Sequence, residues 1–230
     1  MLAGFIFDVE GTLIDSVPQN LRSLQDALEQ HGYRVPYQTL QLYSGLDGDQ
    51  TLQLAIPEAG EAERREILQI QGAIYEREYL PTVRAFDGVR DLFRAITEHG
   101  GRVALATDCK GLPFRRYQSL LNANEYITAT ACGDDVEHGK PDPRLVGIAL
   151  RKLALPGSQA VMVGDTPYDA EAGIEAGAKA AGVLTGGFGN DTLLQAGCFA
   201  VAADVRGLLP SLLRGEAEPE PHQTDWLRSA

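Results

Sequence analysis

"GFIFDVEGTLIDS", residues 4–16, ends a short apolar run with two acids that are separated by a single residue. The run from Gly4 to Phe7 carries no polar side chain, which is typical of a parallel strand that is buried on both faces. Asp8 and Glu10 follow the run, and Gly11 and Thr12 then let the chain turn. Ligands of open α/β sheets gather beyond the carboxyl ends of the strands, so this stretch predicts a buried strand that carries a functional site.

Apolar runs of the same kind recur along the chain. The clearest cover residues 102–107, 159–164 and 179–184, and weaker ones cover 127–132 and 198–203. Between them, apolar residues at three- and four-residue steps predict helices, for example over 88–100 and over 142–155, where Pro143 lies in the first turn. This alternation predicts an α/β fold, with a doubly wound parallel sheet and right-handed crossovers.

Residues from about 15 to 85 break the alternation, because they contain no convincing strand and carry helical patterns instead. The first strand is separated from the next by far more chain than an ordinary crossover needs. We therefore expect a helical cap domain, residues 15–85, that is inserted after the first strand and lies over the two acids. The expected core is residues 1–14 and 86–214, and the Glu- and Pro-rich residues 215–230 are expected to form a C-terminal tail.

Composition narrows the class of protein. Apolar residues make up 44% of the 230, enough for a sizeable core. The net charge of -12 argues against a general affinity for nucleic acids and anionic membranes. No run approaches the roughly 18 apolar residues of a membrane span, the first residues lack the pattern of a signal peptide, and the cysteines form no C-x-x-C pair. We expect a cytoplasmic, soluble monomer or homodimer that binds neither nucleic acid nor membrane.

Polar residues follow the later strands as well as the first. Those at the predicted strand ends and in the adjoining loops are Thr107, Asp108, Lys140, Asp165 and Asp169. Taken singly they are ordinary, since a lone Asp after a strand is usually a helix N-cap and a lone Lys is usually solvated. Because the carboxyl ends of parallel strands meet at one edge of the sheet, we expect these side chains to join Asp8 and Glu10 in a single site.

Several carboxylates in a small space repel one another unless a hard cation lies between them. Mg²⁺ suits such a group, because it takes oxygen ligands in octahedral geometry. Together with a Lys and a hydroxyl donor, it makes a pocket for a phosphate dianion. One Asp carboxylate could then attack phosphorus, and a second acid could protonate the leaving oxygen and later activate a water molecule.

Four segments carry a family resemblance. "FDVEGTL" at 7–13, "LATD" at 105–108, "GKPDP" at 139–143 and "VGDTPYD" at 163–169 resemble the four ordered motifs of the haloacid dehalogenase superfamily of hydrolases. The helical segment after the first motif resembles the cap of the phosphoglycolate phosphatase-like branch. The resemblance spans roughly residues 3 to 205, and it implies a Rossmann-like core with a helical cap and hydrolysis of a phosphate ester.

The resemblance also assigns roles to the matching positions. It implies that Asp8 is the nucleophile and a Mg²⁺ ligand, and that Glu10 is the general acid/base, with a backbone carbonyl that binds the metal. Asp165 would bind Mg²⁺ directly, and Asp169 would support it through water or through Lys140. Thr107 and Lys140 complete the expected catalytic set with Asp8 and Glu10, since Lys140 would neutralise both Asp8 and the phosphate. The residues expected to bind the substrate phosphate are Gly11, Thr107, Asp108 and Lys140.

Glu10 departs from the commonest form of the first motif. Phosphatases of this superfamily usually have Asp there, the dehalogenase branch usually has Tyr, and the phosphonate-cleaving branch has Ala. Glu can carry a proton to a leaving alkoxide, whereas an aromatic residue such as Tyr or an apolar residue such as Ala at this position cannot. The reference pKa of Glu, about 4.3, is close to that of Asp. Enolase-phosphatases of the same superfamily carry the D-x-E-G-T pattern found here, so Glu10 favours a phosphatase.

The predicted function is therefore Mg²⁺-dependent hydrolysis of a small phosphorylated metabolite through an aspartyl-phosphate. A sugar-phosphate mutase of the same fold is an alternative, as is a catalytically weakened member that only binds phosphate. A haloacid dehalogenase is disfavoured, because that reaction needs no Mg²⁺ and both Asp165 and Asp169 are present. Within the expected cap, "SGLDG" at 44–48 could either face the substrate or form an ordinary interhelical loop.

Overall fold

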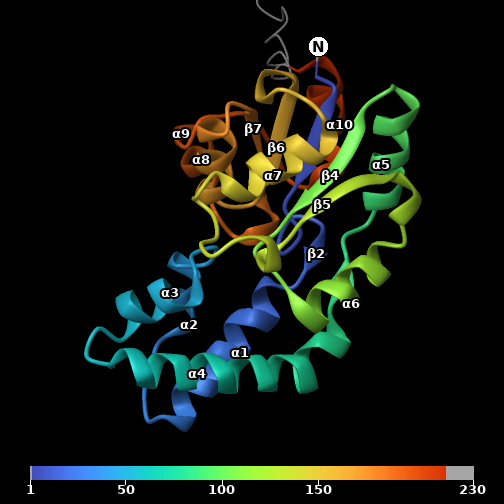
Figure 1. The fold of residues 1–230 in the computed structure, drawn as a ribbon. Helices are drawn as coiled ribbons and strands as arrows, with labels where there is room; N and C mark the ends of the chain where they lie inside the picture. The colour runs from blue at the N-terminus through green and yellow to red at the C-terminus, as the bar shows by residue number, and fades with distance from the viewer. Residues whose placement is uncertain (1, 216–230) are drawn as a thin grey trace, which may run out of the picture.

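The computed structural model describes residues 2–215, and its centre is a six-stranded sheet in the order β5-β4-β1-β6-β7-β8 (Figure 1). The strands are β1 (Gly4–Phe7), β4 (Arg102–Ala106), β5 (Ile127–Ala131), β6 (Ala160–Gly164), β7 (Lys179–Val183) and β8 (Cys198–Ala202). Every neighbouring pair in this sheet is parallel. The predicted α/β fold is confirmed, and each predicted apolar run forms a strand.

Helices cover both faces of the sheet, and alternate residues of the strands pack against different faces. Phe5 and Phe7 of β1 belong to an apolar cluster with α5 (Val89–Glu98), α6 (Gly111–Leu121) and α10 (Val205–Arg214). Ile6, between them, packs on the opposite face with α7 (Arg144–Leu153) and α8 (Pro167–Glu175). Because both faces are covered, the central strands are apolar throughout, as the sequence indicates.

The remaining helix of this part is α9 (Asn190–Gln195), which follows β7. The helix predicted over 142–155 begins two residues later than expected, at Arg144, and Pro143 occupies its N-cap position. Pro143 therefore precedes the first turn and does not lie within it. A proline lacks the N–H that a helix interior needs, so its place at the boundary follows from the same chemistry that predicted the helix start.

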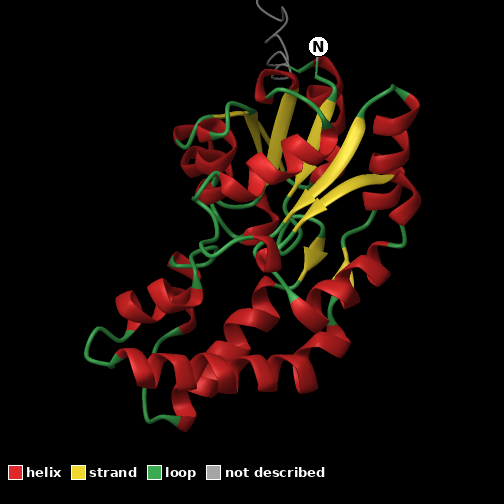
Figure 2. Cartoon of the chain, viewed as in Figure 1, coloured by secondary structure: helices red, strands yellow, loops and turns green. Residues whose placement is uncertain are grey.

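Residues 17–82 are helical, as predicted. They form α1 (Val17–Gln30), α2 (Tyr37–Leu42), α3 (Gly48–Ala55) and α4 (Glu61–Ile74), followed by a π-helical turn at Tyr75–Tyr79 and a 3₁₀ turn at Leu80–Thr82. Most of their buried side chains form an apolar cluster of their own that includes Leu24, Leu28, Leu52 and Ile67, whereas Tyr75 and Leu80 pack into a cluster of the sheet. Figures 1 and 2 show these helices beyond the carboxyl ends of the central strands.

Two short strands lie where the chain passes between the sheet and these helices. β2 (Ile14–Asp15) pairs antiparallel with β3 (Arg84–Ala85). The prediction that residues 15–85 contain no strand is therefore wrong at both ends of the segment. A two-residue strand shows no alternating pattern in the sequence, so only the pairing of its backbone identifies it.

Apart from Gly215, the tail predicted at 215–230 lies outside the described residues. Within residues 2–215, no helix combines the length and the hydrophobicity that crossing a bilayer would require.

Candidate active site

The ends of β1, β4 and β6 bring acidic and basic side chains to one edge of the sheet. Asp8 follows β1 and its backbone N–H donates to the carbonyl of Val163 on β6 at 2.9 Å, which ties the two strand ends together. Asp165 follows β6 directly, and Lys140 reaches the same place from the loop before α7. Asp8, Lys140 and Asp165 are all buried.

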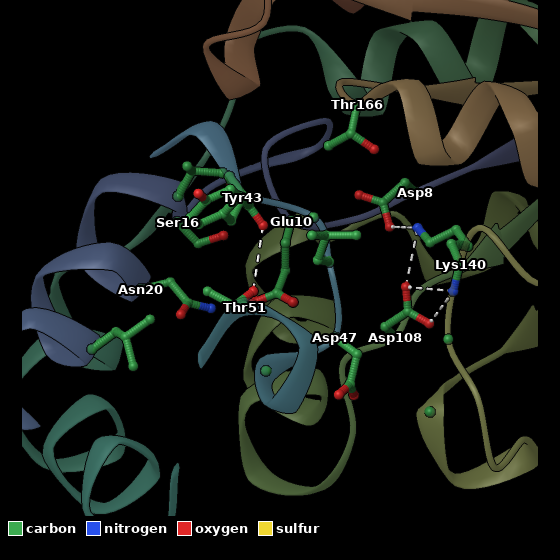
Figure 3. A pocket seen from close by; sticks show the side chains of 18 of the residues that line it. Asp8, Glu10, Ser16, Asn20, Tyr43, Asp47, Thr51, Asp108, Lys140 and Thr166 are labelled. Atoms are coloured by element: carbon green, nitrogen blue, oxygen red, sulfur yellow. Dashed lines mark hydrogen bonds and ion pairs between the residues drawn. The ribbon is translucent and has the colours of Figure 1, made fainter. Parts of the chain in front are cut away.

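Lys140 is the centre of this group (Figure 3). Its Nζ donates to Asp8 Oδ1, to Asp169 Oδ1 at 2.7 Å and to the backbone carbonyl of Ala106 at 3.3 Å. Asp108 lies 3.7 Å from the same ammonium and also accepts the backbone N–H of Lys140 at 3.2 Å. Three carboxylates therefore share one buried cation.

Asp169 is held rigidly because it also caps a helix. Thr166 is the N-cap of α8, and its backbone N–H and hydroxyl both donate to Asp169 Oδ2, at 3.1 and 2.7 Å. This reciprocal capping box is encoded locally, by Thr followed three residues later by an acid, with Pro167 in the first helical turn. With Oδ2 used by the cap and Oδ1 by Lys140, Asp169 positions the lysine.

Asp165 lies in a cradle formed by two glycines. A Cβ added at Gly11 would lie 2.3 Å from Asp165 Oδ2, and one added at Gly186 would lie 1.7 Å from it, so neither position has room for a side chain. The hydroxyl of Thr12 donates to Asp165 Oδ1 at 2.7 Å. Asp165 Oδ2 is buried and has no hydrogen-bond partner. A buried carboxylate oxygen without a partner is costly, and a bound cation would satisfy it.

The donor set fits a hard divalent cation. Carboxylate oxygens of Asp8, Asp165 and Asp169 lie within 4.8 Å of one another, and all three residues are buried. Oxygen donors in this number suit Mg²⁺, which keeps some of its water ligands and needs few carboxylates. Since Asp169 is fully engaged by Lys140 and its own helix, Asp8 and Asp165 are the carboxylates best placed to touch the ion.

The electrostatics of the group point the same way. Burial raises the pKa of Asp165 to about 8, with a further contribution from the charge of Asp169. Burial also raises the pKa of Asp8 well above its ordinary value, although Lys140 opposes this. For Lys140, burial disfavours the ammonium, but the surrounding carboxylates outweigh it and raise the Lys140 pKa well above its ordinary value. The lysine therefore stays charged, whereas the raised pKa values of Asp8 and Asp165 mean that holding both in the ionised form requires further positive charge, which a bound cation would supply.

Glu10 lies beside this group and lines the same cavity. Its Oε1 accepts a hydrogen bond from the hydroxyl of Tyr117 at 3.0 Å. Burial raises the pKa of Glu10, whereas hydrogen bonds from Tyr117 and Asn20 favour its ionised form. Figure 3 shows Glu10 between Asn20 and Lys140.

A cavity of about 330 Å³ separates these residues from the helices of residues 17–82. On the sheet side its wall includes Asp8, Asp108, Lys140, Asp165 and Asp169. On the helical side it includes Asn20, Tyr43, Thr51 and Gln71, none of which the sequence singled out. The whole of "SGLDG" at 44–48 lines the cavity and also connects α2 to α3, so it is an interhelical connection that faces the cavity.

Two of the predicted site residues are not part of the cavity wall. Thr107 is fully buried, and its Oγ1 accepts the backbone N–H of Cys109 at 3.2 Å. Gly11, with a φ of 78°, lies against Asp165 and does not line the cavity. Asp108 lines the cavity, and Gly139 allows its carboxylate to approach, because a Cβ there would lie 2.4 Å from Asp108 Oδ1.

The helical side of the cavity is organised by α1 and α4. Gln71 of α4 donates through Nε2 to Asn20 Oδ1 at 2.8 Å, and Nε2 also lies 3.5 Å from Ser23 Oγ. This leaves the amide nitrogen of Asn20 free to face Glu10. No local pattern predicts these contacts, because Asn20 and Gln71 are ordinary polar positions on two amphipathic helices.

Comparison with known proteins agrees with the fold. Residues 5–183 match the family described as haloacid dehalogenase-like hydrolase. A phosphoglycolate phosphatase of Yersinia pestis is 26% identical over 217 residues, which cover 92% of this chain and 93% of the relative. An N-acetylmuramic acid 6-phosphate phosphatase of Pseudomonas aeruginosa is 26% identical, with 80% of this chain and 83% of the relative covered. The crystal structure of a hydrolase from Pseudomonas syringae has a TM-score of 0.84 and 27% identity, over 93% of this chain and 99% of that one.

Proposed function

The chain belongs to the haloacid dehalogenase-like hydrolase family, and on that basis we propose that it is a Mg²⁺-dependent phosphatase that hydrolyses a small phosphomonoester through an aspartyl-phosphate on Asp8. The observation that carries this proposal is the buried cluster of Asp8, Asp165 and Asp169 around Lys140, in which Asp165 Oδ2 lacks a partner. Relatives that are named phosphatases of phosphoglycolate and of a sugar phosphate support the reaction class.

In the proposed reaction, Asp8, Asp165 and the backbone carbonyl of Glu10 would hold the Mg²⁺ ion, and Lys140 and Asp169 would support them. When bound, the ion would neutralise the carboxylates and the phosphoryl oxygens and so favour attack by one anion on another. Lys140 favours the ionised form of Asp8 and orients its carboxylate, because its ammonium donates directly to Asp8 Oδ1. Asp108 lines the cavity and would contribute its backbone to phosphate binding, whereas Thr107 and Gly11, which lie behind the cavity wall, would support that binding by shaping the adjoining backbone.

The Asp8 carboxylate attacks phosphorus in the first step, and the bond from phosphorus to the ester oxygen breaks. Glu10, protonated, donates its proton to the departing alkoxide, which leaves as an alcohol. In the second step Glu10, now ionised, removes a proton from a water molecule that attacks the aspartyl-phosphate. Phosphate leaves, and Asp8 and protonated Glu10 are restored.

The cavity supports a small substrate. A volume of about 330 Å³ lies at the lower end of the range for small-molecule sites. Its helical wall offers amides and hydroxyls from Asn20, Thr51 and Gln71, alongside apolar side chains such as Leu24 and Leu68. Such a wall would bind a polar leaving group of metabolite size through hydrogen bonds.

The helices over the cavity would act as the cap of the enzyme, with residues 15–85 as the cap and residues 1–14 and 86–214 as the core. Gly45, with a φ of 91°, touches Thr166 of the core so closely that a Cβ would lie 2.7 Å from its Cγ2. This contact would bring the cap against the core and exclude water from the site during phosphoryl transfer.

The test is release of inorganic phosphate from a panel of small phosphate esters by the purified protein with Mg²⁺. We expect turnover of at least one ester, and its loss with a chelator or with Asp8→Asn. Retention of phosphate on an isomerised product would identify a mutase instead. If the metal-loaded protein is inert on the whole panel, the proposal is wrong.

A further inference from the structure

A chain of hydroxyl groups runs from the end of the cap helices to Glu10. The hydroxyl of Tyr117, on α6, donates to Glu10 Oε1 at 3.0 Å. The hydroxyl of Tyr75, in the π-helical turn after α4, is hydrogen-bonded to that of Tyr117. These three side chains come from three separate segments, so the contact ties the end of the cap, the core helix α6 and the acid of the first motif together.

The direction of these hydrogen bonds follows from the chemistry of the groups. A tyrosine hydroxyl has one hydrogen to donate, and Tyr117 uses it toward an acid that accepts when ionised. The Tyr117 oxygen must then accept the hydrogen of Tyr75. Both rings are buried, and burial raises the pKa of Tyr75 and of Tyr117, so both hydroxyls stay protonated and remain donors.

The contact also explains the length of the acid at position 10. Tyr117 engages only Oε1, while the carboxylate as a whole lines the cavity and also receives a hydrogen bond from Asn20 on the helical side. An Asp at this position would be shorter by one carbon–carbon bond, about 1.5 Å, and could not keep the 3.0 Å contact without a shift of the backbone. The Tyr117 hydroxyl would then be buried without an acceptor, which costs stability.

Resting on the function proposed above, we propose that Tyr117 is a positioning residue that fixes one oxygen of Glu10 and aims the other at the substrate's leaving oxygen, and that Tyr75 holds Tyr117 in place from the cap. Glu at position 10 and Tyr at position 117 act as a pair. Correct orientation of the acid then depends on the end of the cap being in contact with the core.

The first test is kinetic and uses Tyr117→Phe, which removes only the hydroxyl. On the alkyl phosphate of the panel with the best turnover, kcat should fall about tenfold or more while KM changes less than threefold, because a hydrogen bond to a charged group is lost. The first turnover of p-nitrophenyl phosphate should slow less than threefold, since p-nitrophenolate leaves without a proton. A general loosening of the site would slow both substrates alike.

The second test is a double-mutant cycle between positions 10 and 117. In a Glu10→Asp background, Tyr117→Phe should change kcat less than threefold, because the shorter acid has already lost the contact. Equal effects of Tyr117→Phe in the two backgrounds would overturn the inference. Tyr75→Phe should also lower kcat, as Tyr117→Phe does. If either single variant folds poorly, the double variant Tyr75→Phe/Tyr117→Phe is measured in its place, because it removes both hydroxyls and leaves neither buried without a partner.

Tyr79→Phe is the matched control. Tyr79 donates to Asp26 Oδ2 at 2.7 Å, so this change also removes a tyrosine–carboxylate hydrogen bond, but within the cap and away from the cavity. Its kcat should match that of the unmodified protein, and Mg²⁺ should raise the melting temperature of all variants equally. Unchanged alkyl-ester turnover in Tyr117→Phe would overturn this inference but leave the proposed function standing. If the unmodified protein releases no phosphate from any ester, the proposed function and this inference are both wrong.

Discussion

Replacing Lys140 by Met should destabilise the folded protein strongly, because the ammonium is the cation that the buried carboxylates share. Lys140 is 5% exposed and donates to Asp8, to Asp169 and to the carbonyl of Ala106. Met has a similar length and fills much of the same space without a charge. The substitution therefore removes the positive charge and leaves most of the packing in place.

The size of the effect follows from the burial of both partners. Removing one member of a buried ion pair costs about 3–5 kcal/mol, because the other charge remains buried and unpaired. Asp8 and Asp169 are both left in this state, but protonation of a carboxylate, favoured by the raised pKa of Asp8, would relieve part of the cost. We expect a loss of about 3 kcal/mol in the free energy of unfolding, or roughly 6–12 °C in Tm.

The assay is urea-induced unfolding, followed by circular dichroism at pH 7.5 in the presence of a chelator, with Tm measured in parallel. Lys152→Met is the matched control, because Lys152 pairs with Asp135 at 3.4 Å on the surface, where such pairs contribute less than about 1 kcal/mol. The loss in Lys140→Met should shrink as the pH is lowered, since protonation removes the unpaired charges. A loss below 1 kcal/mol, or one equal to that of the Lys152 control, would refute the view of Lys140 as the shared cation.

Three further results are expected. Gly186→Ala should abolish Mg²⁺-dependent activity, because the added Cβ would lie 1.7 Å from Asp165 Oδ2. Gly72→Ala in α4 is the control, because its added Cβ would have no atom within 4 Å. This variant should keep its activity and gain about 1 kcal/mol in the free energy of unfolding in urea. Mg²⁺ should raise the Tm of the unmodified protein and leave that of Asp165→Asn unchanged, since a ligand stabilises only the state that binds it. In the presence of a chelator, the free energy of unfolding should fall as the pH rises from about 4 to 8. The reason is that the pKa of Asp165 in the folded protein, about 8, exceeds its ordinary value of 3.8, so the folded protein holds an extra proton that it loses over this interval. Urea unfolding at pH 5 and at pH 7.5 measures the fall in the free energy of unfolding, and Asp165→Asn should reduce it.

The α/β core could be predicted from the sequence because its signals are local. A strand covered on both faces must be apolar throughout, so each run such as Gly4–Phe7 is visible without knowledge of its neighbours. The helix that begins at Pro167 is equally local, since Thr166 and Asp169 satisfy its first backbone groups from within the same turn. Parallel connectivity then requires the residues that follow these strands to meet at one edge.

The candidate site could be predicted in composition but not in detail. The spacing of the motifs predicted that Asp8, Lys140 and Asp165 would meet, since each follows or adjoins a strand end. It did not predict that Thr107 would be enclosed while Asp108 lines the cavity, because neighbouring residues in a loop differ in exposure only through the segments that pack on them.

Only the tertiary structure decided how the acids are held. Thr12 donates to Asp165 across 153 positions of sequence, and Tyr117 donates to Glu10 across 107. Tyr117 occupies a buried position in an amphipathic helix, where a sequence pattern predicts packing and says nothing of the hydroxyl at its tip. A hydrogen bond depends on two atoms meeting within about 3 Å, and that distance is set by the packing of whole helices on the sheet, which no local stretch of sequence contains.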